Sequence, residues 1–125
     1  MSAVLTIYGL KNCDTCRKAR KWLEARANDR DVTFHDLRAD GLDAARLARW
    51  CEEFGWEALL NRRGTTWRGL TDEEKESADE ASAAALMLKH PALIRRPVFE
   101  VGEAGTGGLV LGFDKVAQEA LLGLF

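Results

Sequence analysis

The fold is decided near the N-terminus by residues 4–16, whose sequence is VLTIYGLKNCDTC. Val4–Tyr8 is a short apolar run of β-prone residues that Gly9 ends, which predicts a buried first strand. A basic stretch with helical spacing follows from about Asp14 to Ala27, and residues 32–37 alternate as a second strand does. A strand, a helix and a strand in this order form a βαβ unit, so the two strands should be parallel.

The middle of the chain has the patterns of helices. A helix should begin near Asp43. Its buried face is expected to be formed by Leu47, Trp50, Cys51 and Phe54. Two pairs with capping-box spacing follow, Thr71 with Glu74 and Ser77 with Glu80.

The second of these pairs should open an alanine-rich helix that Pro91 ends. The buried face of that helix is expected to be formed by Ala81, Ala84, Ala85 and Leu88. Residues 41–90 are therefore expected to form a mostly helical insertion. Within it, residues 61–70 are a polar stretch that contains glycine.

The C-terminal part returns to strands. Residues 97–101 predict a strand, the glycines from Gly102 to Gly108 predict a hairpin turn, and residues 109–111 predict an edge strand. Asp114 can cap a last helix, whose buried face should be formed by Ala117, Ala120, Leu121 and Leu124. The order βαβ, helices, ββα predicts an α/β, thioredoxin-like fold with a helical insertion between its two halves.

Length and composition limit the class of protein. The 125 residues, 46% hydrophobic and 30% charged, suit one globular domain. We expect a single domain over residues 1–125, with a core formed by 1–40 and 91–125 and the insertion at 41–90. The net charge of −2 argues against direct binding of nucleic acid, and no apolar run approaches the ~20 residues that span a membrane. Because no signal peptide is visible, we expect a cytoplasmic protein with reduced thiols.

The motif Cys13-Asp14-Thr15-Cys16 joins the first strand to the first helix. A thiol at a helix N-terminus meets unpaired N–H groups and the positive end of the helix dipole, which favour the thiolate. Lys11 and Arg17 add positive charge nearby. Cys16 lies on the same side of the first turn, from which it can attack a mixed disulfide on Cys13. This placement predicts a redox site.

The cysteines allow three other interpretations. In the first, Cys13 and Cys16 would form half of a zinc site, but only Cys51, His35 and His90 remain as further soft ligands and none makes a second spaced pair. We therefore expect no metal. Alternatively, Cys16 is a buried small residue of the helix, and Cys13 acts alone. Cys51 lies on an apolar stripe and is expected in the core.

Arg95-Arg96-Pro97 is the second candidate feature of the site. A thioredoxin-like fold has a cis-proline at the start of the strand that faces the reactive cysteine, and Pro97 stands in that place. The side chain of Arg96 would then flank the Cys13 sulfur and stabilise a thiolate or bind an oxyanion. Arg95 should alternate away toward solvent. The alternative is an ordinary trans proline that starts a strand.

Further segments complete a pattern that covers essentially the whole chain. They are WEALLN at 56–61, GTTWR at 64–68, His90-Pro91 and residues 95–97, and they join residues 8–13 and the basic helix. This pattern resembles the arsenate reductase/Spx family, and within it a branch described as glutathione-dependent thiol reductases. The resemblance implies a thioredoxin-like core with a helical insertion, no bound cofactor, and glutathione as co-substrate.

The resemblance also implies roles for particular residues. In the glutaredoxin-coupled arsenate reductases of this family, a cysteine that matches Cys13 attacks arsenate, and glutathione and glutaredoxin resolve the adduct. The arginine before the cis-proline matches Arg96, and an arginine of the insertion has its approximate counterpart in Arg62 or Arg63. A third arginine has no match, since Leu111-Gly112-Phe113 stands there, and Gly9-Leu10 replaces a histidine and an asparagine. Arsenate binding should be weaker without that arginine, because each charge-assisted hydrogen bond contributes about 1.5–3 kcal/mol.

Two functions follow. The first is a thiol-dependent reductase of a small oxyanion or a disulfide, which takes electrons from glutathione or glutaredoxin. Cys13 is its nucleophile and Cys16 a candidate resolving thiol, and the site is completed by Arg96, Arg62, Arg63, Lys11 and Pro97. The alternative is a redox-sensing regulator of the Spx type, in which a Cys13–Cys16 disulfide switches binding to RNA polymerase.

Overall fold

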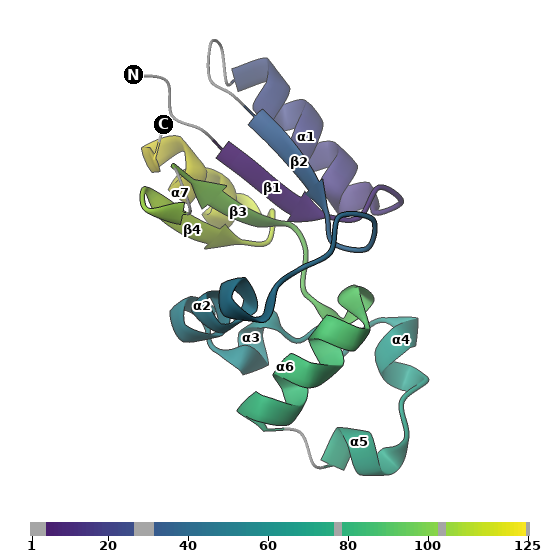
Figure 1. The fold of residues 1–125 in the computed structure, drawn as a ribbon. Helices are drawn as coiled ribbons and strands as arrows, with labels where there is room; N and C mark the ends of the chain where they lie inside the picture. Colours follow the sequence, from purple (N-terminus) through teal and green to yellow (C-terminus); the bar gives the residue numbers. More distant parts are fainter. Residues whose placement is uncertain (1–4, 27–31, 77–78, 103–104, 125) are drawn as a thin grey trace. The chain divides into compact units, whose positions relative to one another are not determined.

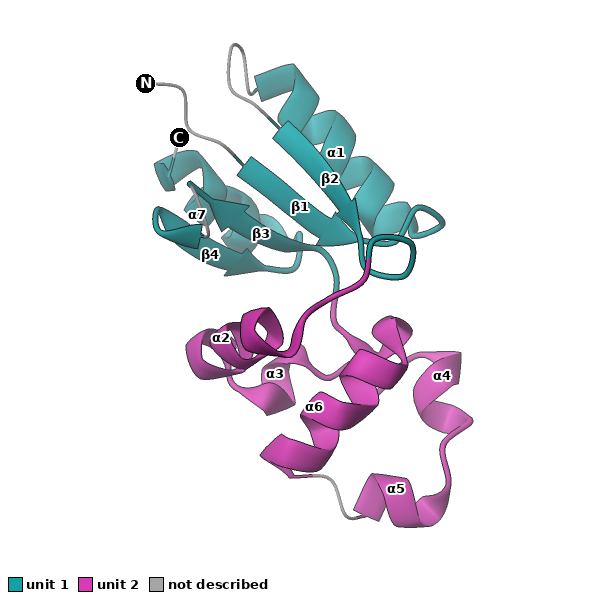
Figure 2. Cartoon of the chain, viewed as in Figure 1, with its two compact units in different colours: residues 1–40, 96–125 teal, residues 41–95 magenta. Residues whose placement is uncertain are grey.

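The structure is a computed structural model, which describes residues 5–26, 32–76, 79–102 and 105–124 (Figure 1). The chain divides into two compact units (Figure 2). Unit 1 is formed by residues 1–40 and 96–125 and carries the sheet, and unit 2 is formed by residues 41–95 and is helical.

The second boundary lies between Arg95 and Arg96, later than the expected end of the insertion at residue 90. The last residues of unit 2 stay with its helices because they pair with them. Leu60 and Ile94 form an isolated antiparallel bridge, and the backbone N–H of Arg95 donates to the carbonyl of Leu59 at 2.7 Å. That the two units make up a single domain stays a prediction.

Unit 1 is built on a sheet with the strand order β2-β1-β3-β4. β1 (Leu5–Gly9) pairs in parallel with β2 (Val32–Asp36), which confirms the βαβ prediction. β3 (Val98–Val101) pairs antiparallel with β1, and β4 (Gly108–Leu111) pairs antiparallel with β3. Because Tyr8 lies opposite Val98, the start of β3 lies beside the point where the chain leaves β1 toward the first cysteine.

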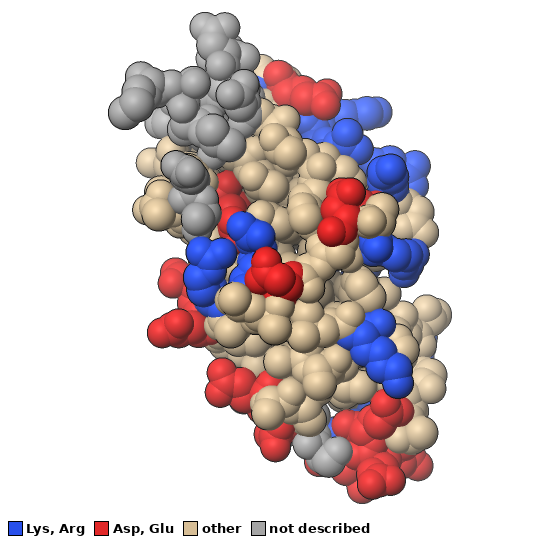
Figure 3. All heavy atoms as spheres, in the orientation of Figure 1, with Lys and Arg blue, Asp and Glu red and all other residues tan. Residues whose placement is uncertain are grey.

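Two helices share one face of this sheet. α1 (Asp14–Arg26) and α7 (Lys115–Leu124) both contribute to a single buried cluster with the strands. Its members are Leu5, Ile7, Ala19, Leu23, Phe99, Val101, Val110, Ala117 and Leu121. Burial of such side chains contributes about 25 cal/mol per Å² of apolar surface and is the main force that holds unit 1 together. The basic side chains of α1 lie outside its buried stripe of Cys16, Ala19 and Leu23, and Figure 3 shows basic side chains over this part of the surface.

α7 follows its prediction in its cap and in part of its buried face. The backbone N–H of Ala117 donates to Asp114 Oδ1 at 2.9 Å, so Asp114 caps the helix as expected. Ala117 and Leu121 are buried, but Ala120 is exposed. The prediction for Ala120 was therefore wrong, because the helix contacts the sheet along a narrower stripe than the pattern suggested.

Unit 2 consists of short helices. They are α2 (Ala44–Phe54), α3 (Trp56–Leu59), α4 (Thr65–Arg68), α5 (Asp72–Glu76), α6 (Glu80–Lys89) and the 3-10 turn η1 (Pro91–Leu93). Asp43 caps α2, and Leu47, Trp50 and Cys51 of its predicted face are buried, whereas Phe54 of that face is half-buried. The Thr71–Glu74 capping box is present before α5, with bonds of 2.9 and 3.1 Å. The polar stretch 61–70 contains α4, which the sequence did not predict.

α6 corrects two predictions. Its capping box is formed by Asp79 and Ser82, each of whose side chains accepts from the other's backbone N–H at 2.8 Å. The expected partner Ser77 lies outside the described residues. The buried side chains of the helix are Ala83 and Met87, whereas Ala81, Ala85 and Leu88 of the expected face are exposed. A run of alanines carries little apolar periodicity, so its pattern did not define the buried face.

Other predictions fall partly outside the described residues. These are the first residue of strand 4–8, the last of helix 14–27, and two residues of the expected hairpin turn, 103 and 104. Of the described turn residues, Gly107 donates its N–H to the carbonyl of Val101 at 2.7 Å. The observed order of strands and helices is that of a thioredoxin-like fold with a helical insertion, which confirms the predicted fold class.

Candidate functional site

Cys13 stands at the N-terminus of α1. Its backbone N–H donates to the carbonyl of Leu10 at 3.2 Å, and its own carbonyl accepts from the N–H of Arg17 at 3.0 Å. The turn from Leu10 therefore delivers Cys13 to the cap position of the helix, where unpaired N–H groups are available. The thiol is free and only partly buried. This is the placement that the sequence predicted.

The surroundings of Cys13 favour its ionised form. Partial burial raises the pKa of the Cys13 thiol, but this effect is outweighed by hydrogen bonds from the backbone and the thiol of Cys16 and from Arg96, together with the positive charge of Arg96. The pKa of Cys13 consequently lies below its ordinary value. A lowered pKa gives a larger fraction of thiolate, which is the nucleophilic form of cysteine.

Cys16 has the opposite character. It is fully buried on the inner stripe of α1, and this burial raises its pKa to about 12. A Cβ atom added at Gly9 would lie 2.5 Å from the Cys16 sulfur, so β1 and the first turn of α1 approach closely at this point. Cys16 is thus a protonated thiol that donates a hydrogen bond to Cys13. Its sulfur packs against Gly9, where a larger residue would not fit.

Arg96 and Pro97 are joined by a cis peptide bond, as predicted. Pro97 is buried, and its carbonyl accepts from the N–H of Gly112 at 2.8 Å, which connects the start of β3 to the end of β4. Arg96 reaches the Cys13 sulfur, since its hydrogen bond and charge both lower the pKa of that thiol. The first unit therefore brings together Cys13, Cys16 and Arg96 from segments far apart in the sequence.

Lys11 and Arg17 each act on an acidic side chain. Arg17 forms an ion pair with Asp14 at 3.2 Å on the exposed side of the helix. The charge of Lys11 acts on Asp36, and its backbone N–H donates to Asp36 Oδ2 at 3.2 Å. Both basic side chains are exposed. The positive charge that acts on the Cys13 sulfur is that of Arg96.

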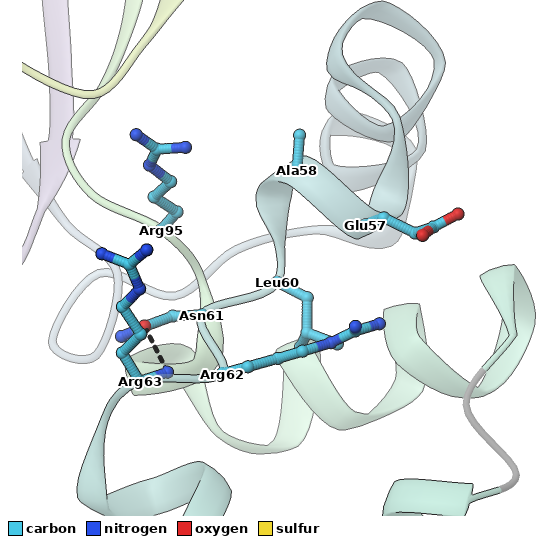
Figure 4. Close-up of a pocket in the computed structure, with 7 residues that line it drawn as sticks. All are labelled: Glu57, Ala58, Leu60, Asn61, Arg62, Arg63 and Arg95. Atoms are coloured by element: carbon cyan, nitrogen blue, oxygen red, sulfur yellow. Dashed lines mark hydrogen bonds between the residues drawn. The ribbon is translucent and has the colours of Figure 1, made fainter.

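The expected arginines of the insertion lie in unit 2. Arg62 and Arg63 line a cavity of about 300 Å³ together with Arg95, Asn61, Glu57, Ala58 and Leu60 (Figure 4). The guanidinium of Arg62 lies over the rings of Trp56 and Trp67, at 5.8 and 5.6 Å. Arg63 and Arg95 point to one side of the cavity in Figure 4, whereas Arg62 points to the other. Two guanidinium groups on one side of a cavity favour an anion there.

Two residues were missed by sequence reasoning. Arg95 was expected only to face solvent; it is exposed, but it also lines the cavity with Arg63. Asp36 lay inside the predicted strand 32–37, yet its buried carboxylate accepts N–H groups from two loops. The position of Arg95 beside Arg96 could have indicated a role for it in binding. For Asp36, an aspartate near the end of a strand could have indicated a turn in which its carboxylate accepts backbone N–H groups.

Cys51, the third thiol, is buried in α2 as expected, and burial followed by the charge of Glu80 raises its pKa. Among the described residues, no three His, Cys, Asp or Glu side chains gather as metal ligands do. In the same residues, no helix is both long and apolar enough to cross a bilayer. Figure 3 shows acidic side chains gathered at α5, where Asp72, Glu73 and Glu74 form the first turn.

The sheet order, the cis-proline and the cysteine at the start of the first helix define a thioredoxin-like protein. The particular family is given by the sequence itself: the chain belongs to the ArsC family, whose sequence model matches residues 8–121. It is 38% identical over 117 residues to an uncharacterised protein of Haemophilus influenzae, with 94% of this chain and 97% of that protein covered.

Two further comparisons concern named relatives. The solution structure of an arsenate reductase related protein from Brucella melitensis is 46% identical, with a TM-score of 0.71 and coverage of 98% of this chain and 95% of that one. The global transcriptional regulator Spx of Bacillus subtilis is 29% identical over 98 residues, which cover 76% of this chain and 72% of the regulator. The resemblance to an arsenate reductase and Spx family is thereby confirmed.

Proposed function

We propose that this protein is a cytoplasmic thiol-dependent reductase in which Cys13 is the nucleophile. One observation carries the proposal: Cys13 caps α1 and has a lowered pKa, because the Cys16 backbone, the Cys16 thiol and Arg96 all stabilise its thiolate. The membership of the ArsC family and the likeness to an arsenate reductase related protein support a reductase. Glutathione or glutaredoxin is the proposed source of electrons.

The chemistry with a disulfide substrate has three displacements. The Cys13 thiolate attacks one sulfur of the substrate, a Cys13–substrate disulfide forms, and the other substrate sulfur leaves with the electron pair of the broken bond. A glutathione thiolate then attacks the Cys13 sulfur, forms a glutathione–Cys13 disulfide and releases the second substrate thiolate. A second glutathione thiolate attacks the glutathione sulfur of that disulfide, forms glutathione disulfide and releases the Cys13 thiolate, so two electrons pass from two glutathiones to the substrate.

We propose that an external thiol, rather than Cys16, carries out the second displacement. An attack by Cys16 requires its thiolate, and with a pKa of about 12 that form is scarce at neutral pH. The buried thiol of Cys16 has a different use, which is to donate a hydrogen bond to the Cys13 thiolate. Under this proposal Cys16 stabilises the nucleophile and does not resolve the adduct.

Anionic substrates are favoured by the arginines. Arg96 acts at the Cys13 sulfur, and Arg63, Arg62 and Lys11 remain the proposed binding residues for a small oxyanion or for the carboxylates of a thiol. Pro97 is proposed to hold the backbone beside the sulfur. Arsenate is the less favoured oxyanion, because Leu111-Gly112-Phe113 occupies the place of a third arginine in the family's arsenate reductases.

The test compares three proteins: the native chain, Cys13→Ala and Cys16→Ala. Each is assayed for reduction of a mixed disulfide of glutathione and of arsenate, with glutathione and glutaredoxin as reductants. We expect no turnover with Cys13→Ala and retained turnover with Cys16→Ala. Loss in both variants would instead assign the second displacement to Cys16. A Cys13 pKa at the ordinary thiol value, measured by ultraviolet titration of the thiolate, would contradict the proposal itself.

The likeness to Spx supports a second candidate, a redox-sensing regulator. It requires that oxidation join the Cys13 and Cys16 sulfurs, which already contact one another through a hydrogen bond. The protein would then bind RNA polymerase in only one redox state. Capture on the immobilised protein from oxidised and from reduced lysate tests this candidate, and the absence of polymerase from both samples would exclude it.

A further inference from the structure

Asp36 ends β2 at a point where two loops leave the sheet side by side. It lies opposite Gly9 in the parallel ladder, and the N–H of Leu37 donates to the carbonyl of Gly9 at 2.8 Å. From Gly9 the chain runs into the loop of residues 10–13, which ends at Cys13. From Asp36 it runs into the turn of residues 37–40. The Asp36 side chain is only 5% exposed.

The two oxygens of the Asp36 carboxylate serve different loops. Oδ1 accepts the backbone N–H groups of Arg38 and Ala39, both at 2.8 Å, which is the local bonding of an aspartate turn. Oδ2 accepts the N–H of Lys11 at 3.2 Å, in the loop that leads to Cys13. The N–H groups of Ala39, Arg38 and Lys11 lower the pKa of Asp36, so the carboxylate is charged at neutral pH. The local turn accounts for the first oxygen but not for the second.

The loop and the turn also line a cavity of about 240 Å³, whose lining residues are Leu10, Lys11, Asn12, Asp36, Arg38 and Ala39. The loop is short, and the Cys13 N–H is bonded back to the carbonyl of Leu10. A shift at Lys11 would therefore be transmitted to the cap of α1. Small displacements of a reacting group are costly, because the stabilising donors must lie at hydrogen-bond distance.

We infer that the buried carboxylate of Asp36 is a positioning residue, which holds Lys11 and through it sets the Cys13 sulfur against the N-terminus of α1 and Arg96. The inference rests on the proposed role of Cys13 as nucleophile. The charged groups that face Asp36 are Lys11 and Asp40, whose Oδ2 accepts the Asp36 N–H at 3.0 Å. The titratable groups that act on the Cys13 sulfur are the Cys16 thiol, which is protonated, and the charged guanidinium of Arg96.

Asp36→Asn tests this role with little change in shape. An asparagine has one acceptor oxygen, which can keep the bonds to Arg38 and Ala39, and its amide group would then face the Lys11 N–H, donor against donor. The measurement is the pH profile of iodoacetamide alkylation at Cys13, followed by mass spectrometry of the digested protein. We expect a Cys13 pKa about one unit higher, and hence alkylation roughly tenfold slower at acidic pH.

Asp40→Asn is the matched control. It makes the same change of charge in the same turn and retains an oxygen for the Asp36 N–H, so the Cys13 profile should stay in place. A second pair of variants changes Lys11, the donor of the bond to Asp36 Oδ2. Lys11→Pro removes the backbone N–H, while Lys11→Ala keeps the N–H and removes only the charged side chain. The difference between the two Lys11 variants isolates the N–H, and Asp36→Asn combined with Lys11→Pro should give no further change.

The outcomes separate this inference from the proposed function. If the native protein shows an ordinary thiol pKa at Cys13, the proposed function fails. If the native value is lowered and a folded Asp36→Asn variant retains it, only the role of Asp36 fails. If Asp36→Asn does not fold, which thermal unfolding would reveal, the comparison of Lys11→Pro with Lys11→Ala decides. Equal profiles for those two variants would then overturn the inference.

Discussion

Units 1 and 2 are held together in different ways. In unit 1, strands from both ends of the chain pair with β1, and the core cluster joins side chains from the sheet, α1 and α7. Unit 2 relies more on local bonds, since Asp43, Thr71 and Asp79 each cap the start of a helix with a partner three residues on. The described exceptions include the bridge between Leu60 and Ile94 and the backbone hydrogen bonds beside it, from Arg95 to Leu59 and from Asn61 to Leu93.

The two candidate features of the site differ in the same way. The pKa of Cys13 is lowered through Arg96, a residue distant in sequence that only the sheet pairing brings near. Such a site requires the packing of unit 1 to be correct throughout. The cavity of Arg62, Arg63 and Arg95 depends instead on two short segments of unit 2 that are joined by the hydrogen bond from the Arg95 N–H to the Leu59 carbonyl. Substitutions that disturb the packing of unit 1 should therefore change the pKa and reactivity of Cys13 more than substitutions that remove a helix cap.

Gly9→Ala should have the largest effect of the changes considered. Its new Cβ would lie 2.5 Å from the Cys16 sulfur and 3.3 Å from the Cys16 Cβ, between β1 and α1. Overpacking of this kind costs about 1–3 kcal/mol, which chemical denaturation measures as a lower free energy of unfolding. Because Cys16 must move, the alkylation rate of Cys13 should fall as well.

Gly123→Ala is the control for the glycine change, since nothing lies within 4 Å of a Cβ at that position of α7. It should be neutral, or stabilising by about 0.5–1 kcal/mol, as alanine is in a helix. Cys16→Ala should restore much of the stability lost in Gly9→Ala, because it removes the sulfur that the new methyl group meets. A Gly9→Ala protein as stable as the native one would show that β1 and α1 are not closely packed there.

The sequence predicted the structure well where an element depends only on residues close to one another in the chain. The alternating strands, the stripe of α2 and the Asp114 cap were all predicted, because each depends on residues within a turn or two of one another. The cis bond at Pro97 was predicted from its place in the fold. The buried face of α6 was not, since a stretch such as Ala83 to Ala85 gives no contrast between its faces.

The candidate site was predicted less completely than the fold. Cys13 and Arg96 were found, because a motif and a proline marked them. The contribution of Asp36 was not, since it depends on the distance between two loops, which no local pattern encodes. Lys11 was expected to add positive charge near Cys13 because it is close in sequence, but in the structure its backbone N–H donates to Asp36 and its charge lowers the pKa of Asp36.

A second prediction uses pH to separate Cys16 from the rest of unit 1. Its folded pKa is raised to about 12, above the ordinary value of 9.0, so the folded state binds more protons than the unfolded state between these values. The stability that Cys16 contributes is therefore full below pH 9 and is lost as pH rises toward 12. The loss amounts to at most about 1.4 kcal/mol per pH unit.

The measurement is the free energy of unfolding from pH 8 to 10 in the Cys13→Ala background, with and without Cys16→Ala. The titration of tyrosines and lysines contributes equally to both proteins and cancels in the difference between their free energies of unfolding. This difference should become smaller as pH rises. For Cys13 the sign is opposite, since a lowered folded pKa adds stability above the unfolded value and loses it as pH falls through the folded value. A difference that does not change with pH would mean that Cys16 ionises as freely in the folded state as in the unfolded state.

The smallest expected effect is that of a cap in unit 2. Asp43→Ala removes the oxygen that accepts the Arg46 N–H at 2.7 Å, which should cost about 1 kcal/mol in the free energy of unfolding. Asp43→Asn keeps an acceptor and should cost much less, although it also removes the exposed ion pair with Arg46 at 3.7 Å. Asp114→Ala, the same change at the start of α7 in unit 1, should cost a similar amount, because capping is local in either unit. A much larger loss for Asp114→Ala would mean that unit 1 depends on its caps as well as on its long-range packing, and the contrast between the two units would then be weaker than the hydrogen bonds suggest.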